Sequence, residues 1–323
     1  MKHKAVFLGL GFFIILMMGS NAQQENIPVL ETPFSSLKSH VMTHEIYASG
    51  NGQGTNREKG KIVFCSDRDG NSEIYVMKED EAEQRRLTNN NSFDGYAKFS
   101  LDGKLIVFLS DRSGSYEIFI MNSDGADVRQ VTSSMPYVHF PSFSSDGTKL
   151  IFNSREKGET VFLILNLSDG AATRYLPGRT NVYHPAWSPL GDKIAFDIAA
   201  DNNQDIYVAN TDGSRLLRLT DNLKSDFYPA WSPDGKQIAF QSGRNHNLDI
   251  CVMKADGSQK KYITEHRALD EFPSWGPDNK HIVFESRRTG KKQIFTIRSD
   301  GTGLRQITFG DYNNSHPDWS KEL

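Results

Sequence analysis

The sequence predicts an all-β fold, a six-bladed β-propeller with four antiparallel strands in each blade. Three observations predict it: an aromatic motif at a fixed spacing, Asp-Gly turns between short β-branched runs, and an incomplete repeat at each end. A period in the low to middle forties with four strands per unit is typical of propeller blades, which bury their faces against neighbouring blades.

The first two strands of each blade are marked by motifs that recur every 44 residues. An aromatic residue, usually followed by Ser, marks the innermost strand, and an apolar run ending in Phe marks the second strand. The apolar run begins as Ile62-Val63-Phe64 and recurs up to Ile282-Val283-Phe284. The aromatic positions are Phe99, Phe143, Trp187, Trp231, Trp275 and Trp319.

The third and fourth strands follow at the same period. Ile74-Tyr75 begins the series for the third strand, and Leu87-Thr88 begins that for the fourth. Asp-Gly pairs such as Asp102-Gly103 and Asp124-Gly125 separate the runs, as expected for tight turns in an antiparallel meander.

The two ends of the chain complete one blade between them. The first repeat has no aromatic-Ser motif, because the position 44 residues before Phe99 is Thr55, in a Gly- and Asn-rich stretch. The last fragment, residues 316–320, supplies that strand. We therefore expect the strand of Trp319 to pair with that of Ile62, which closes a propeller over residues 60–323 and leaves no open sheet edge.

The N-terminus predicts export. Lys2 and Lys4 precede an apolar run and a small-residue site, which indicates a signal peptide over residues 1–22, cleaved after Ala22. The run is short for a membrane span and lacks a basic flank, so an uncleaved anchor is the less favoured alternative. Residues 23–59 are expected to form an extension or linker, and the protein to be periplasmic or secreted by a bacterium.

Composition and cysteine positions exclude other classes. The formal net charge is −3 with no basic stripe, which argues against a nucleic-acid partner. Cys65 and Cys251 fall in repeats that are not neighbours in the ring, so we expect two free, buried thiols.

One repeat carries a family resemblance. Residues 229–240, Pro-Ala-Trp-Ser-Pro-Asp-Gly-Lys-Gln-Ile-Ala-Phe, resemble the repeat of the TolB-type propellers, and the likeness covers about residues 60–320. The resemblance implies a periplasmic protein that binds proteins, as that family binds a peptidoglycan-associated lipoprotein and colicins. Residues 23–59 are too few for the α/β domain of that family. Similar blades also occur in prolyl-oligopeptidase relatives and oligogalacturonate lyases.

The two faces of the predicted ring differ. The turns after the aromatic-Ser pair and before the fourth strand are near-copies, which turn chemistry explains; we call their side the repeated-turn face. The loops into the innermost strand and between the second and third strands differ between blades, and they form the variable-loop face. Because the fold leaves these loops free to vary, we expect a binding site there, at the channel mouth.

The candidate site combines aromatic rings with a polar arc, which consists of Asp94, Asp226, Asp270 and Asn314. Rings would supply contact area, and carboxylates would orient a ligand or basic group. No cofactor is expected, although a calcium ion beside Asp226 and Asp270 is a less favoured option. His184 and His316 lie on opposite blades, so a shared transition metal requires a narrow channel. The candidates are Asp94, Tyr96, His139, Phe140, Tyr183, His184, Asp226, Tyr228, Asp270, Phe272, Asn314 and His316.

Two alternatives concern the same residues and the arginines. The rings could instead fill the channel while the Asp side chains cap turns. Four arginines recur at the period, which favours structural pairing with Glu73, Glu117 or Asp249 over anion binding: Arg68, Arg112, Arg244 and Arg288. Arg155, His139 and Arg179 do not follow the repeat and are therefore better site candidates.

The expected function is binding of an envelope or periplasmic protein, or of a cell-surface glycan. The sequence has no nucleophile elbow, zinc motif or phosphate-binding glycine loop, so an enzyme is less favoured. The alternative is a carbohydrate-active lyase or hydrolase with His184, Tyr183 and Tyr228 at the channel mouth. A structural or sensor subunit is the third possibility.

Overall fold

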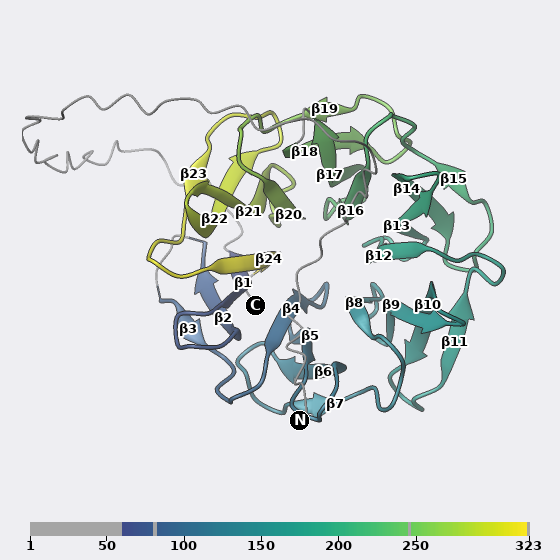
Figure 1. Ribbon diagram of the computed structural model, residues 1–323, viewed down its shortest axis with the longest axis horizontal. Helices are drawn as coiled ribbons and strands as arrows, with labels where there is room; N and C mark the ends of the chain where they lie inside the picture. The colour runs from purple at the N-terminus through teal and green to yellow at the C-terminus, as the bar shows by residue number, and fades with distance from the viewer. Residues whose placement is uncertain (1–59, 80–82, 245–246, 322–323) are drawn as a thin grey trace, which may run out of the picture. The chain divides into compact units, whose positions relative to one another are not determined.

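The computed structural model describes residues 60–79, 83–244 and 247–321, which form strands and turns without a helix. The strands make six four-stranded antiparallel sheets arranged in a ring (Figure 1). The predicted six-bladed propeller is therefore confirmed. The expected signal peptide over 1–22 and the extension over 23–59 lie outside the described residues.

Each blade runs from an innermost strand at the channel to a short outermost strand. Blade 1 contains β24 (Asn314–Lys321), β1 (Gly60–Ser66), β2 (Glu73–Lys78) and β3 (Arg85–Arg86). Blade 2 contains β4 (Asp94–Phe99), β5 (Leu105–Ser110), β6 (Glu117–Asn122) and β7 (Arg129–Gln130). Blade 3 contains β8 (His139–Phe143), β9 (Lys149–Glu156), β10 (Glu159–Asn166) and β11 (Ala172–Tyr175).

The other three blades follow the same order. Blade 4 contains β12 (Val182–Trp187), β13 (Lys193–Ala200), β14 (Asn203–Asn210) and β15 (Leu217–Arg218). Blade 5 contains β16 (Asp226–Trp231), β17 (Gln237–Arg244), β18 (Asn247–Lys254) and β19 (Lys261–Tyr262). Blade 6 contains β20 (Asp270–Trp275), β21 (His281–Thr289), β22 (Lys291–Arg298) and β23 (Arg305–Gln306).

The core lies between neighbouring blades. The second and third strands are buried on both faces, which explains their continuous apolar runs in place of an apolar-polar alternation. The Phe that ends each apolar run of the second strand, from Phe64 to Phe284, is fully buried. Between blades 1 and 2, for example, Val63 and Ile74 pack in one cluster with Phe108.

The repeated Thr lies just beyond the fourth strand rather than within it, in contrast to the prediction. In five blades the strand has only two residues, and the Thr hydroxyl then accepts a hydrogen bond from a backbone N–H of the third strand. The side chain thereby replaces a backbone acceptor that the short strand does not supply. The donor–acceptor pairs are Ile74–Thr88, Ile118–Thr132, Ile206–Thr220, Ile250–Thr264 and Ile294–Thr308, at 2.8–2.9 Å.

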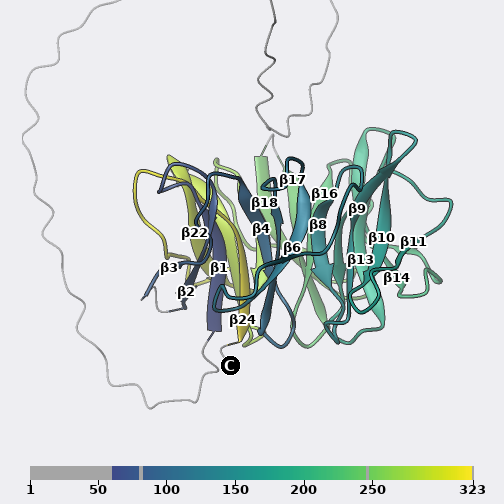
Figure 2. The same ribbon diagram turned by 90° about the horizontal axis from the view of Figure 1, so that it is seen from below.

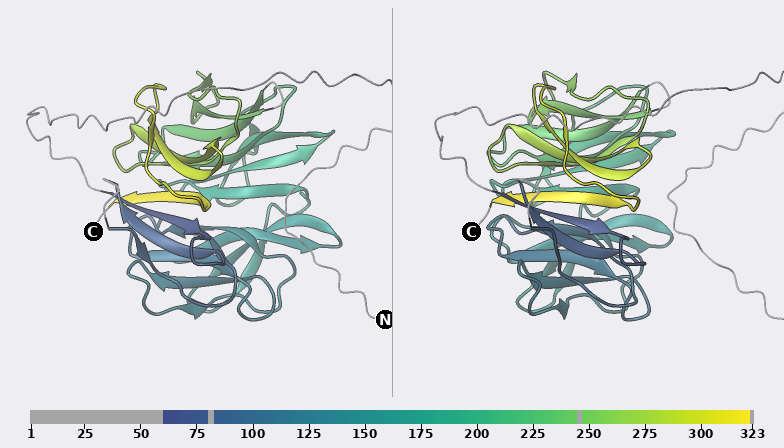
Figure 3. Two further views of the ribbon diagram at one scale, coloured as in Figure 1. Left: turned by 60° about the vertical axis from the view of Figure 1, so that its left-hand side comes forward. Right: turned by 90° about the vertical axis from the view of Figure 1, so that its left-hand side faces the viewer.

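The two ends of the described chain close the ring as predicted. Strand β24 pairs antiparallel with β1, and Trp319 lies opposite Ile62 in the register. Figure 3 shows the yellow β24 beside the dark-blue β1. Blade 1 therefore joins the beginning and the end of the propeller.

Loops and turns emerge on two opposite sides of the ring, as Figure 2 shows from the side. Cys65 and Cys251 are free and buried, which confirms the expectation for the thiols. Across the described ranges, no helix is long and apolar enough to cross a membrane.

Candidate functional site

Each innermost strand contains a β-bulge at the predicted aromatic residue. The pairing with the second strand shifts there in all six blades, as between Phe227 and Ala230. The aromatic residue at the bulge has a positive φ, which is uncommon outside glycine. The bulge changes the direction in which this side chain points. In five blades the next residue is Pro, which a bulge tolerates because no ladder hydrogen bond is needed there. The bulged aromatics are Tyr96, Phe140, His184, Tyr228, Phe272 and His316, with φ between 50° and 56°.

These six side chains contact one another around the channel, and we call them the aromatic ring. Adjacent centroids lie from 3.5 Å apart, for His184 and Tyr228, to 5.4 Å apart, for Tyr96 and Phe140. Phe140 also reaches Tyr228, two blades away, at 5.6 Å. The aromatic ring thus fills the channel at this level, as the alternative reading of these residues expected.

Polar side chains of the second strand hold the bulges in place. In four blades the residue after the repeated Phe accepts a hydrogen bond from the backbone N–H of the next blade's bulged aromatic. The pairs are His184–Asn153, Tyr228–Asp197, Phe272–Gln241 and His316–Glu285, at 2.9–3.3 Å. These acceptors were not predicted from the sequence, although a polar residue in an otherwise apolar strand was a usable signal. Cys65 and Leu109 occupy the equivalent positions in the other two blades.

Two polar side-chain pairs adjoin the aromatic ring on the variable-loop side. His184 Nδ1 lies 2.8 Å from Asp197 Oδ1, and Lys292 Nζ lies 2.7 Å from the buried Glu285. Glu271 faces Glu285 across the β20–β21 pair. Burial and the neighbouring Glu285 raise the pKa of Glu271 to about 7. Glu271 therefore gains or loses its charge near neutral pH.

Two of the candidate histidines are uncharged at neutral pH. Burial, with help from Arg155 and His184, lowers the pKa of His139 to about 4. Burial also lowers the pKa of His316 to about 4. Both imidazoles therefore offer neutral rings for packing rather than positive charge.

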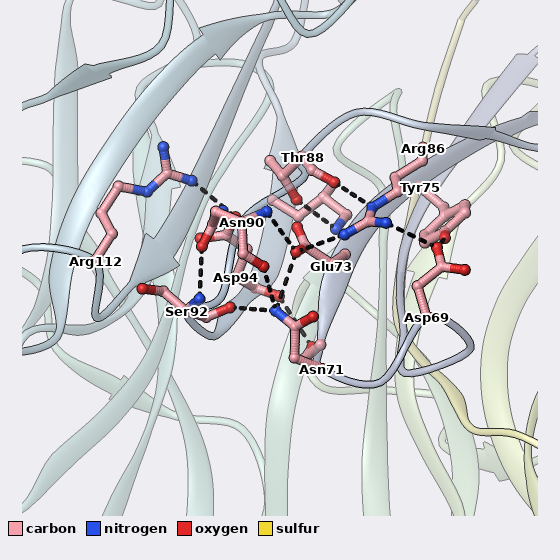
Figure 4. Close-up of polar contacts among 12 residues, drawn as sticks. Asp69, Asn71, Glu73, Tyr75, Arg86, Thr88, Asn90, Ser92, Asp94 and Arg112 are labelled. Carbon is pink, nitrogen blue, oxygen red and sulfur yellow. Dashed lines mark hydrogen bonds and ion pairs between the residues drawn. The ribbon is translucent and has the colours of Figure 1, made fainter.

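The predicted polar arc is turned into the blades. Asp94, Asp226, Asp270 and Asn314 are fully buried, and each contacts a side chain of its own blade or the adjoining loop. Figure 4 shows Asp94 between Asn90 and Arg112, each with a nitrogen 2.7 Å from Oδ2. Arg288 donates to both Asp270 oxygens at 2.8 Å, and Asn222 donates to Asp226 at 2.6 Å. Arg68 donates to Asn314 at 3.0 Å.

The structural role of the recurrent arginines is confirmed, but most of the expected partners are wrong. Only Arg244 lies near its expected partner, with Nε 3.7 Å from Asp249. Glu73 binds Arg86 instead, and Glu117 accepts hydrogen bonds from the Thr132 hydroxyl and the Ser134 backbone. Arg112 and Arg288 instead bind the acidic residue that begins the innermost strand of their own blade, which is Asp94 or Asp270.

An aromatic patch lies on the variable-loop face of blades 2 and 3. It consists of Phe93, Tyr116, Tyr137 and His139. Neighbouring rings of the patch have their centroids 4.3–5.6 Å apart. The Arg155 guanidinium lies 4.2 Å from the Tyr137 centroid, and Tyr116 is 42% exposed. Of these residues only His139 and Arg155 were predicted as site candidates from the sequence.

The remaining candidates are not part of the patch. Tyr183 packs against His184 at 5.9 Å on blade 4, and Arg179 is exposed on the preceding loop. Within the described part of the chain, no three His, Cys, Asp or Glu side chains are grouped so as to hold a metal ion.

A cavity of about 420 Å³ occupies the channel on the repeated-turn side of the aromatic ring. The aromatic ring forms one end of this cavity, and the other reaches Leu101, Pro189, Pro233 and Pro277 in the repeated turns. This cavity therefore lies on the side opposite to the variable loops, whereas the sequence predicted a site at the variable-loop mouth of the channel.

Solved structures share this fold. TolB from Acinetobacter baumannii superposes with a TM-score of 0.74 at 17% identity, over 81% of this chain and 67% of that one. A protein assigned as TolB from Agrobacterium tumefaciens gives 0.65 at 20% identity, over 78% and 88%. Oligogalacturonate lyase from Vibrio parahaemolyticus gives 0.53 at 14% identity, over 76% and 73%.

Sequence comparison identifies the family. A search of curated proteins finds no match. The family model of the TolB beta propeller domain matches three overlapping segments, residues 56–181, 115–247 and 227–322. These segments cover all six blades, and the chain belongs to the TolB beta-propeller family.

Proposed function

We propose that the protein is an exported binding module that engages a protein of the bacterial envelope through its variable-loop face. The observation that carries the proposal is the aromatic patch with Arg155, which presents the residue types that dominate protein–protein contacts. Membership of a family of binding propellers and the predicted signal peptide support it.

Exposed apolar side chains on two other loops of the same face also support a protein partner. Leu223 is 98% exposed on the loop into β16, and Phe309 is 58% exposed on the loop into β24. Exposed patches of apolar side chains mark interaction surfaces, and a partner that spans these loops would cover both side chains. The partner would then contact several blades at once and rest on the filled channel.

Partner capture from envelope extract tests the proposal. The double variant Tyr116→Ala, Leu223→Ser is expected to lose the partner that the wild-type protein retains, with its thermal unfolding temperature almost unchanged. Leu190→Ala is the control, because Leu190 is also exposed, at 65%, but lies in a repeated turn. Equal retention by the double variant, or loss with Leu190→Ala, would contradict the proposal.

The His184–Asp197 pair favours a second candidate function, a carbohydrate-active enzyme. A buried carboxylate 2.8 Å from Nδ1 orients an imidazole as it does in general-base pairs, and Tyr228 lies against the same ring. A lyase would produce an unsaturated product that absorbs ultraviolet light from a uronic-acid polysaccharide. This activity should vanish in His184→Ala, and its absence from the wild-type protein would exclude this lyase reaction.

A further inference from the structure

Lys98 and Asp318 interrupt the repeat at one level of the cavity wall. The other four innermost strands have small residues at this position, Ser142, Ala186, Ala230 and Ser274, and all six line the cavity. Strands β24 and β4 belong to neighbouring blades and contact each other. The cavity therefore has a charged sector on blades 1 and 2 and a neutral wall on the other blades.

The two charged groups are satisfied to different degrees. Asp318 Oδ1 accepts a hydrogen bond from Ser274 Oγ at 2.8 Å, and Oδ2 accepts one from the Phe99 N–H at 2.9 Å. The Lys98 ammonium forms no hydrogen bond or ion pair with any described residue. Burial lowers the pKa of Lys98, and Asp318 counteracts this only in part. Lys98 thus brings an amino group with unused donors to an enclosed space, where a bound anion would favour its charged form.

The charge and shape of the lining select an anion. Among the Lys, Arg, Asp and Glu side chains of the lining, Lys98 and Lys321 outnumber Asp318, whereas the whole chain is negative. The rest of the wall combines serines with flat aromatic and proline side chains. It includes all four tryptophans of the protein and six prolines: Trp187, Trp231, Trp275, Trp319, Pro189, Pro229, Pro233, Pro273, Pro277 and Pro317. A volume of about 420 Å³ falls in the range of small-molecule sites.

We propose that this cavity binds a small organic carboxylate, with the anionic group at Lys98 and a planar or apolar body against the tryptophans. The ligand would enter from the repeated-turn face, because the aromatic ring fills the channel on the other side. This site is separate from the variable-loop face, so either one can exist without the other.

Tryptophan fluorescence tests the proposal directly, because every tryptophan of the protein lines the cavity. Titration with phenylacetate, excited at a wavelength where the probe does not absorb, should give a saturable change with Kd on the order of 1 mM. Its neutral analogue phenylacetamide should bind at least tenfold more weakly. This comparison uses the unaltered protein and therefore does not depend on whether a variant folds.

Variants locate the site. Lys98→Met should weaken phenylacetate binding at least tenfold and leave the weak binding of phenylacetamide unchanged. Lys104→Met is the matched control, because Lys104 belongs to the same β4–β5 hairpin but lies outside the cavity lining. The proposal is overturned by any of three results: no saturable change with phenylacetate, equal affinity for the amide, or undiminished binding by Lys98→Met.

Discussion

At the residue scale, Arg288 shows why the recurrent arginines stabilise the blades. Its guanidinium binds both oxygens of the fully buried Asp270. Arg288→Met would leave that carboxylate buried without a positive partner, and we expect the free energy of unfolding to fall by about 3 kcal/mol. Chemical denaturation measures the loss.

Arg244→Met is the comparison for that prediction. Arg244 binds Glu265, whose side chain is 82% exposed, and lies 3.7 Å from Asp249. Asp249 keeps other hydrogen-bond donors, so we expect a loss of only about 1 kcal/mol. Equal losses in the two variants would show that burial of Asp270 does not set the effect.

Glu271 is expected to make stability depend on pH. Its pKa rises from the ordinary 4.5 to about 7, so between these values the folded protein holds a proton that the unfolded chain has released. The free energy of unfolding contributed by this group therefore falls as pH rises through that window. Glu271→Gln should flatten the slope and stabilise the protein at pH 8 by roughly 1 kcal/mol, after allowance for solvent screening.

Thermal unfolding at a series of pH values measures this effect. Glu265→Gln serves as the control, because its side chain is exposed and the slope should stay as in the wild-type protein. A Glu271→Gln variant with the wild-type slope would assign the pH dependence to another group.

At the scale of the element, the short fourth strand depends on the Thr that follows it. Thr264→Val retains the shape of the side chain but leaves the Ile250 N–H buried without its acceptor. We expect a loss of about 1–2 kcal/mol in the free energy of unfolding, whereas Thr264→Ser should lose less because the hydroxyl remains. Urea denaturation of the two variants tests this order, and the reverse order would contradict the role of the hydroxyl.

The sequence could predict an element when one residue type recurs at one position. The 44-residue step of Trp187 and its equivalents predicted the innermost strands and the pairing of Trp319 with Ile62. It also placed Tyr228 and its equivalents at the channel, although their ligand-binding role stays a prediction. Their mutual contacts depend on the positive φ of the bulge, which residue spacing does not reveal.

The features that the sequence could not predict depend on contacts between side chains of different elements. Asp270 is held in the blade by Arg288, eighteen residues later in sequence, which reaches it from the end of β21 in the same blade. The aromatic patch joins Phe93, Tyr116 and Tyr137, which occupy unrelated positions of their repeats. Lys98 departs visibly from the small residues at the equivalent position of four other blades. This departure indicates a binding site only once the position is known to face a cavity.

At the scale of the whole molecule, the ring depends on a single closing strand. Deletion of residues 314–323 would leave β1 as an open edge with its backbone groups unpaired. We expect the unfolding temperature to fall on the order of 10 °C or more and the protein to associate. Differential scanning calorimetry and size-exclusion chromatography measure both effects. A chain that ends at Lys321 should behave like the wild-type protein, and a stable monomer without β24 would contradict the prediction.

The pairing of Gly60 with Lys321 also fixes how the propeller can be attached to anything else. Lys321 ends an innermost strand at the repeated-turn side, so the chain enters and leaves the domain at neighbouring points on that side. The attachment point of any tether that reaches the domain through Gly60 therefore lies on the repeated-turn side. The variable loops, on the opposite side of the ring, stay clear of that attachment point.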